Sequence, residues 1–245
     1  MNGTQTVGRA LEILSVIAEA GTTLSVSEIA ERVGIPESTT YRLLQTLEQN
    51  CVIERKAKGQ IALGLKILDL ARSLYQQMDR ELCMITRPVM EQLTAKTEET
   101  TVLMVRTGLN IVCIQNVESQ RLIRFALENG RVLPLHTSAS GKSILAFENS
   151  KVIEQVLHSM DNQERKENLI TELECIRHQG YSITLGEADK DVFGIGAPIY
   201  DAYGRVMASL TIAGPVDRLK EENKKELIKE ILNATRGISD KLGVR

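Results

Sequence analysis

Apolar residues in the first part of the chain recur at intervals of three and four, the spacing of one buried helix face. This pattern predicts a first helix over residues 6–19. Ser25 and Glu28 stand three positions apart, as in a capping box, in which each side chain bonds the other residue's backbone N–H. A second helix is therefore predicted to begin after Ser25 and to run through Val33.

A third helix is predicted to follow a break at Gly34, with Pro36 in its first turn. Proline is tolerated there because the first N–H groups of a helix have no partner within it. Leu43, Leu44 and Leu47 form the apolar stripe of this helix. Three short helices of this kind predict a compact three-helix unit of about 45 residues.

The pattern then changes to short β-prone stretches. Residues 51–55 and 60–63, joined by a turn at 56–59, predict a hairpin beside the helices. Helical spacing returns over residues 65–96, with a break expected near Pro88. A long amphipathic stretch between two folded units is typical of a connector and a dimerisation element.

The second half alternates between strand-like and helical segments and predicts an α+β fold, an antiparallel sheet covered by helices. The expected domains are a winged helix-turn-helix over 1–64, linker helices over 65–96 and a sheet domain over 97–245. Strands are expected at 101–105, 111–117, 122–127, 193–200 and 206–212, and helices at 141–147, 152–157, 169–179 and 218–242. Residues 201–204 have the composition of a turn between the last two strands.

Composition narrows the class of protein. The 245 residues carry 30 Lys and Arg against 32 Asp and Glu, a formal net charge of -2. No apolar run approaches the roughly 20 residues of a membrane helix, and no secretion signal is evident at the N-terminus, so a cytoplasmic protein without membrane contact is expected. The four cysteines lack the short spacings of disulfide frameworks or zinc sites. Neither a metal nor another cofactor is expected.

The stretch from Ile29 to Ile35 has the spacing of a helix-turn-helix, in which Ala30 permits close helix approach and Gly34 supplies the turn. With the leucine stripe inward, Ser38, Thr39 and Arg42 fall on the exposed N-terminal face of the third helix. A recognition helix places such groups against base edges and phosphates. These three residues are the predicted core of a double-stranded DNA interface.

The predicted hairpin carries basic residues where a wing contacts the DNA backbone. These are Arg55, Lys56 and Lys58, and Arg9 on the first helix is expected on the same side. Residues 1–80 nevertheless carry nine basic and nine acidic residues. A positive surface therefore requires that the basic residues gather on the DNA side and the acidic residues lie elsewhere. Few phosphate contacts per head are expected.

At this point the chain resembles the IclR-type family of bacterial transcription regulators over nearly its whole length. The resemblance is carried by residues 7–14, 38–47, 63–64, 133–142, 180–181, 195–201 and 212–215, in that order. Thr40 departs from the pattern, since the family more often has an apolar residue there, and the segment 60–64 lacks the usual aromatic residue before Leu63 and Gly64.

The resemblance implies a GAF-like effector-binding domain from about residue 80 onward. The small residues at 138–141 open a predicted helix and, in the family, form one wall of the effector pocket. By position, the implied pocket residues are Ala139, Ser140, Gly141, Thr184, Val192, Gly194, Thr211 and Ala213. The hydroxyls of Ser140 and Thr211 suit a carboxylate or a carbonyl group.

Two enzyme interpretations fail on their motifs. Gly141-Lys142-Ser143 matches the end of a phosphate-binding loop, but His136 stands where the first glycine of that motif belongs. No Gly-x-Ser-x-Gly nucleophile elbow is present. We therefore expect a protein that is not an enzyme.

The expected function is a ligand-responsive transcription regulator that binds operator DNA as a homodimer or a dimer of dimers. Repression of a catabolic operon, released or retuned by a small organic-acid type metabolite, is the favoured mode. The alternative is a small-molecule sensor whose helical head binds a protein partner instead of DNA.

Overall fold

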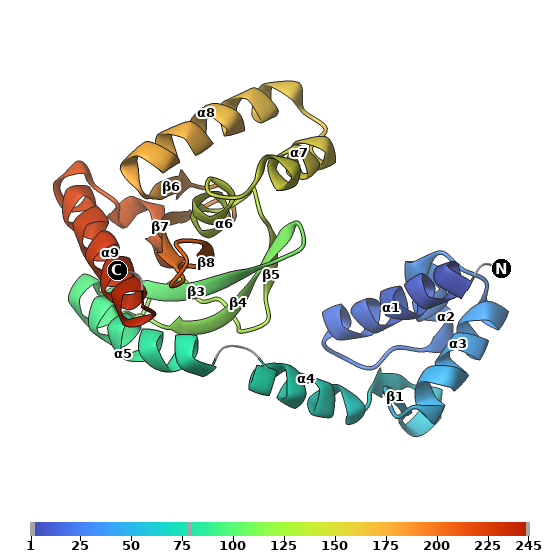
Figure 1. Cartoon of the computed structure of the whole chain (residues 1–245). Coiled ribbons are helices and arrows are strands. Elements are labelled where there is room, and N and C mark those ends of the chain that lie inside the picture. The colour runs from blue at the N-terminus through green and yellow to red at the C-terminus, as the bar shows by residue number, and fades with distance from the viewer. Residues whose placement is uncertain (1–2, 78–79, 244–245) are drawn as a thin grey trace. The chain divides into compact units, whose positions relative to one another are not determined.

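The computed structural model describes residues 3–77 and 80–243, which divide into two compact units, Met1–Arg80 and Glu81–Arg245 (Figure 1). The segment expected to form the linker is shared between them. Its first helix, α4 (Lys66–Gln77), belongs to the first unit, and its second, α5 (Arg80–Thr97), begins at the boundary and continues into the second. None of the described helices is both long and apolar enough to cross a membrane.

The first unit contains the three predicted helices, α1 (Gly3–Ala20), α2 (Val26–Val33) and α3 (Glu37–Gln49). The capping box is present, since Ser25 Oγ accepts from the backbone N–H of Glu28 and the Glu28 carboxylate accepts from that of Ser25 at 2.7 Å. Gly34 adopts the left-handed conformation with φ 70°, which a residue with a Cβ adopts at a cost. The helix-turn-helix is therefore built as the sequence predicts.

The predicted hairpin is also present and completes the core of this unit. Strands β1 (Ile53–Arg55) and β2 (Ile61–Leu63) pair antiparallel around the short 3₁₀ turn η1 (Ala57–Gly59). Leu24, before α2, makes a two-way backbone bridge with Ile61. The buried core of the unit consists of Ile13, Ile17, Leu24, Ile29, Leu43, Leu44, Ile53 and Ile61.

The second unit is an antiparallel six-stranded sheet in the order β5-β4-β3-β8-β7-β6, which confirms the α+β class. Its strands are β3 (Thr100–Thr107), β4 (Asn110–Val117), β5 (Val132–Pro134), β6 (Ser182–Leu185), β7 (Val192–Tyr200) and β8 (Val206–Pro215). Its remaining helices are α6 (Ala139–Leu145), α7 (Ser150–Ser159), α8 (Gln163–Gln179), the short η2 (Val216–Arg218) and α9 (Glu221–Lys241).

Helices cover both faces of this sheet (Figure 1). On one face α5 and α9 lie side by side, joined by a 2.8 Å ion pair between Lys96 and Glu230. On the other face α6 lies on the central strands, with α7 and α8 packed outside it. The core on this second side combines strand residues such as Val102 and Met104 with Ile144 of α6 and Leu173 of α8.

The expected helix break near Pro88 is wrong, because α5 continues through this residue. Proline removes one backbone hydrogen bond and strains the turn before it. Leu82, Met90 and Leu93 of the same helix are all buried, each at most 4% exposed. The packing of this apolar face holds the helix together against the local preference of proline.

The expected strand at 122–127 is also wrong, since these residues have no strand structure. The strand that follows β4 in the chain is β5 (Val132–Pro134). Leu122 and Ile123 are 96% and 72% exposed, so the apolar residues that suggested a strand do not lie in the core. The sequence reading missed β6, whose four residues at the sheet edge are too few to show a clear alternation.

Candidate DNA-binding surface and effector cavity

Helix α3 presents the face that the sequence predicts. Leu43 and Leu44 point into the core, while Ser38 and Arg42 are exposed and Thr39 is half-buried. Thr40, the departure from the family pattern, is fully buried, and its hydroxyl donates to the carbonyl of Pro36 at 3.2 Å. The helix therefore tolerates a polar residue in the core because its hydroxyl is satisfied within the first turn.

Arg42 lies on the exposed side of α3. Within residues 3–77 and 80–243 no ion pair or hydrogen bond of its side chain is found. Its guanidinium is planar and carries five N–H donors, which suits a two-point contact with a phosphate or a guanine edge. The first two turns of α3 thus offer the hydroxyls of Ser38 and Thr39 and one uncommitted guanidinium on one side.

Unlike Arg42, two of the basic residues of the hairpin have carboxylate partners in the described part of the chain. Arg55 Nε donates to Glu48 at 2.8 Å, and its guanidinium lies 5.2 Å from the ring centre of Tyr41, both on α3. Lys56 pairs with Glu54 at 2.5 Å. Lys58 is exposed at the tip of the hairpin with φ 59°. Two of the three predicted wing charges are therefore partly neutralised by neighbouring carboxylates.

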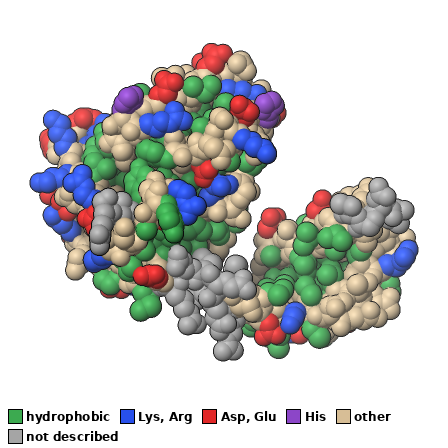
Figure 2. All heavy atoms as spheres, in the orientation of Figure 1, with side chains coloured by type: hydrophobic (Ala, Val, Ile, Leu, Met, Phe, Trp, Pro, Cys, Tyr) green, Lys and Arg blue, Asp and Glu red, His purple; other side chains and the backbone are tan. Residues whose placement is uncertain are grey.

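The seventh predicted DNA contact, Arg9, lies half-buried on α1, outside both the recognition helix and the hairpin. On the exposed side of the same helix stand Val7 and Leu11, which are 61% and 60% exposed. Figure 2 shows hydrophobic side chains at the surface of this unit. An apolar strip of this kind is typical of a surface that another protein covers.

In the second unit, seven of the eight predicted pocket residues line one narrow cavity of about 50 Å³ between α6 and the sheet. They are Ala139, Ser140, Thr184, Val192, Gly194, Thr211 and Ala213. The hydroxyls of Ser140 and Thr211 lie 2.7 Å apart and bond each other. No charged side chain lines this cavity in the described part of the chain. It is an apolar space with a few hydroxyls, as ligand pockets commonly are.

The close approach of α6 to β7 shapes this cavity. A Cβ on Gly196 would lie 2.8 Å from the backbone of Ala139, and one on Gly194 would lie 3.2 Å from the Ala139 side chain. Gly141, the eighth predicted pocket residue, does not line the cavity. A Cβ there would lie 2.2 Å from the carbonyl oxygen of Leu135, so glycine at this position permits the turn before α6 to pack against the helix.

The opposite wall of the cavity consists of residues that the sequence reading missed. Phe125 and Leu127 come from the irregular segment between β4 and β5. Thr100 Oγ1 donates to the carbonyl of Phe125 at 2.6 Å, and Asn116 Nδ2 donates to that of Leu127 at 2.7 Å. Phe125 and Leu127 stand two positions apart, which places them on one side of an extended segment; the same spacing predicts a strand, which is not formed here.

A charged pair lies next to this wall. Arg218 Nη1 donates to both carboxylate oxygens of Glu99 at 3.0 Å, and Arg218 Nη2 donates to the carbonyl of Ile123. The Glu99 side chain is only 5% exposed. Burial raises the pKa of this carboxyl group above its ordinary value, and the charge and hydrogen bonds of Arg218 oppose that rise. The pair anchors the segment that carries Phe125.

Comparison with known proteins agrees with this architecture. The helix-turn-helix model of the IclR family matches residues 6–56, and the model of the C-terminal part of bacterial IclR transcriptional regulators matches residues 76–240. The HTH-type transcriptional repressor AllR of Escherichia coli K12 is 28% identical over 99% of this chain and 92% of its own length.

Solved structures share the fold across both units. The crystal structure of Thermotoga maritima IclR has a TM-score of 0.71 and 28% identity, covering 98% of this chain and 99% of its own. An IclR homologue from Microbacterium hydrocarbonoxydans, solved in complex with 4-hydroxybenzoate, has a TM-score of 0.78 at 24% identity over 97% of this chain and 98% of its own. The exposed face of α3 on its helix-turn-helix, together with these matches, shows that the chain is a DNA-binding transcription regulator that belongs to the IclR family.

Proposed function

We propose that this regulator represses a catabolic operon in the cytoplasm and that a small organic-acid type metabolite releases or retunes it. The observation that carries the DNA half is the N-terminal part of α3, where Ser38 in the first turn and Arg42 in the second are exposed on a helix whose other face is core. In helix-turn-helix proteins the N-terminal residues of this helix contact base edges in the major groove. The similarity to AllR, a transcriptional repressor, supports the sign of the response.

The proposed effector site is the narrow cavity beside α6. The hydroxyls of Ser140, Thr184 and Thr211 are suitable partners for a carboxylate or carbonyl, and the remaining surface suits a small apolar body. A volume of about 50 Å³ holds little more than a few water-sized groups. A metabolite therefore has to displace Phe125 and Leu127, and this displacement is the proposed start of the response. The complex of a related protein with 4-hydroxybenzoate, an organic acid, supports this ligand class.

The proposed assembly is a homodimer or a dimer of dimers, joined through the helices over 65–96. Leu65, Leu68 and Leu70 are 74%, 66% and 55% exposed at the start of this segment. Large apolar side chains exposed close together are typical of a surface that another protein covers. Two heads would then bind half-sites spaced by about one helical turn of DNA or a multiple of it, and the effector would shift the population of geometries that fit.

Footprinting on the intergenic DNA upstream of the protein's own gene tests the DNA half. We expect a protected region with two half-sites. If no DNA is protected and the helical head instead captures a defined protein, the alternative of a protein-binding sensor is correct.

A thermal-shift screen of small organic acids tests the effector half. A ligand at about one hundred times its Kd stabilises the folded state by about 2.7 kcal/mol, which raises Tm by several degrees. Ala139→Trp fills the cavity and should abolish the shift. Because that variant is bulky, Thr211→Val provides a size-matched test that removes only the hydroxyl. Thr235→Val, at a buried threonine on α9, is its control.

A further inference from the structure

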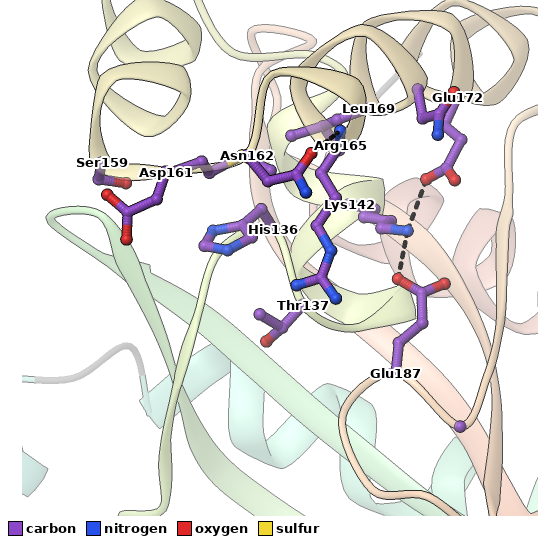
Figure 3. A pocket seen from close by; sticks show the side chains of 13 residues that line it. His136, Thr137, Lys142, Ser159, Asp161, Asn162, Arg165, Leu169, Glu172 and Glu187 are labelled. Carbon is purple, nitrogen blue, oxygen red and sulfur yellow. Dashed lines mark hydrogen bonds and ion pairs between the residues drawn. The ribbon is translucent and has the colours of Figure 1, made fainter.

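A second and larger cavity opens on the outside of the turn that precedes α6. This outer cleft has a volume of about 580 Å³ and shares no lining residue with the effector cavity. Figure 3 shows it between the turn at His136 and Thr137, the loop that joins α7 to α8, and the loop after β6. Its lining is mostly polar and charged, in contrast to the apolar inner cavity.

One wall of the outer cleft is a buried ammonium group between two carboxylates. Lys142 Nζ lies 2.5 Å from Glu172 Oε2 and 2.6 Å from Glu187 Oε2, and the lysine side chain is only 5% exposed. The two glutamates come from α8 and from the loop after β6, and they are 47% and 39% exposed. This acidic wall carries one negative charge in excess, and the second oxygen of each carboxylate is uncommitted in the described part of the chain.

The same cleft also carries an uncommitted guanidinium. Arg165, in the first turn of α8, has no carboxylate within 4.0 Å of its side chain among residues 3–77 and 80–243. Figure 3 shows its side chain extending into the cleft between His136 and Lys142. Burial, followed by the positive charges of Lys142 and Arg165, lowers the pKa of His136, so the imidazole is neutral near pH 7. Asp161 stands on the rim beside Ser159.

These charges determine which ligand the cleft accommodates. A simple anion at Arg165 would leave the excess charge of the acidic wall unmatched, and a simple cation at the wall would leave Arg165 without a partner. A carboxylate binds a guanidinium through two parallel hydrogen bonds, and an ammonium suits the free oxygens of two carboxylates. We propose that the outer cleft is a second ligand site for a small zwitterion, whose carboxylate binds Arg165 and whose ammonium binds Glu172 and Glu187.

The three histidines of the chain provide a direct probe of this site in the full-length protein. Of the three, only His136 lines the outer cleft, so His158 and His178 serve as internal references, and His136→Gln assigns the resonance. Glycine, β-alanine and 4-aminobutyrate carry the same two charges at increasing separation. We expect at least one of them to shift the His136 imidazole resonance and to raise the pKa of His136, because a bound carboxylate adds negative charge beside the ring.

Single-charge analogues and matched variants test the two halves of the site separately. Butyrate and butylamine should each bind at least tenfold more weakly than the best zwitterion. Arg165→Ala and Glu187→Gln should each weaken its binding at least tenfold, which corresponds to about 1.4 kcal/mol. Lys166→Ala removes a positive charge from the adjacent position of α8, outside the cleft lining, and should leave binding unchanged.

Three results would overturn the proposal. Equal binding of butyrate would make the cleft a simple anion site, and equal binding of butylamine would make it a cation site. The absence of any shift of the His136 resonance up to about 10 mM of every zwitterion, a concentration above that of ordinary metabolite affinities, would mean that Arg165 pairs with the acidic wall in solution.

Discussion

The candidate site of the first unit, the head, lies on its surface, whereas that of the second unit, the effector domain, lies in its interior. In the head, Ser38 and Arg42 lie on the surface of a helix whose packing depends on other residues, such as Leu44 and Ile29. In the effector domain, Ser140 and Thr211 are 5% exposed and lie within the packing of α6 against the sheet. Substitutions at the head surface are therefore expected to change DNA affinity without changing stability. Substitutions around the effector cavity are expected to change both.

One of the two largest expected effects is at Gly141, where packing allows no Cβ. Gly141→Ala places a methyl group 2.2 Å from the carbonyl oxygen of Leu135, so backbone has to move. We expect a loss of about 3 kcal/mol in the free energy of unfolding of the effector domain, at the upper end of overpacking effects. Gly8→Ala in α1 is the control, because a Cβ there has no neighbour within 4 Å.

Thermal or chemical denaturation followed by circular dichroism measures both variants. Gly8→Ala should be neutral or stabilise the head by about 0.5–1 kcal/mol, since alanine favours helix over glycine. Equal stability of the two variants would contradict the packing described for the turn before α6.

A comparably large effect is expected at Arg218, which anchors the segment next to the effector cavity. Arg218→Met leaves the Glu99 carboxylate buried without its partner, which typically costs about 3–5 kcal/mol. Arg205→Met removes an exposed ion pair with Asp201, and its cost should stay within about 1 kcal/mol. Comparing the free energies of unfolding of the two variants shows how much more a buried ion pair contributes to stability than an exposed one.

The loss in Arg218→Met should depend on pH with a definite sign. Without the arginine, the pKa of Glu99 rises further, so the folded state binds more protons than the unfolded state above about pH 4.3. Stability then falls as pH rises, and the deficit should be larger at pH 7 than at pH 4. A deficit that is independent of pH would show that Glu99 is not the group left uncompensated.

A smaller effect is expected at the cap of α2. Ser25→Ala removes the side chain that accepts from the N–H of Glu28, and loss of such a cap costs about 0.5–2 kcal/mol. Ser15→Ala, on the exposed side of α1, is the matched control. The helix-turn-helix should lose stability only in the first variant, as measured by denaturation of the full chain.

Local signals in the sequence predicted the head and the central strands. The Ser25 and Glu28 pair, the turn at Gly34 and the leucine stripe of α3 each act over a few residues, and the structure confirms them. Contacts between distant residues left no such signal. The bonds of Lys142 to Glu172 and Glu187 span 30 and 45 positions, so the outer cleft was not predicted.

The effector cavity was predicted only in part. Seven of its residues were placed by resemblance to a family, because small residues at 139, 194 and 213 have no chemistry that marks a pocket by itself. The alternating apolar residues of segment 122–127 predict a strand, yet Leu122 and Ile123 face solvent. The position of this segment depends on side chains such as Thr100 and Arg218, which lie elsewhere in the chain.

The central claim is that α3 binds DNA through the exposed face of its first two turns. Its most direct test is fluorescence anisotropy on the footprinted duplex at several salt concentrations, with the wild type, Arg42→Ala and Arg55→Ala. Arg42→Ala should lose about 1–3 kcal/mol of binding free energy, roughly five- to 150-fold in Kd. Arg55→Ala should lose less, because Glu48 already partly neutralises that guanidinium. Unchanged affinity and unchanged salt dependence in Arg42→Ala would contradict the claim.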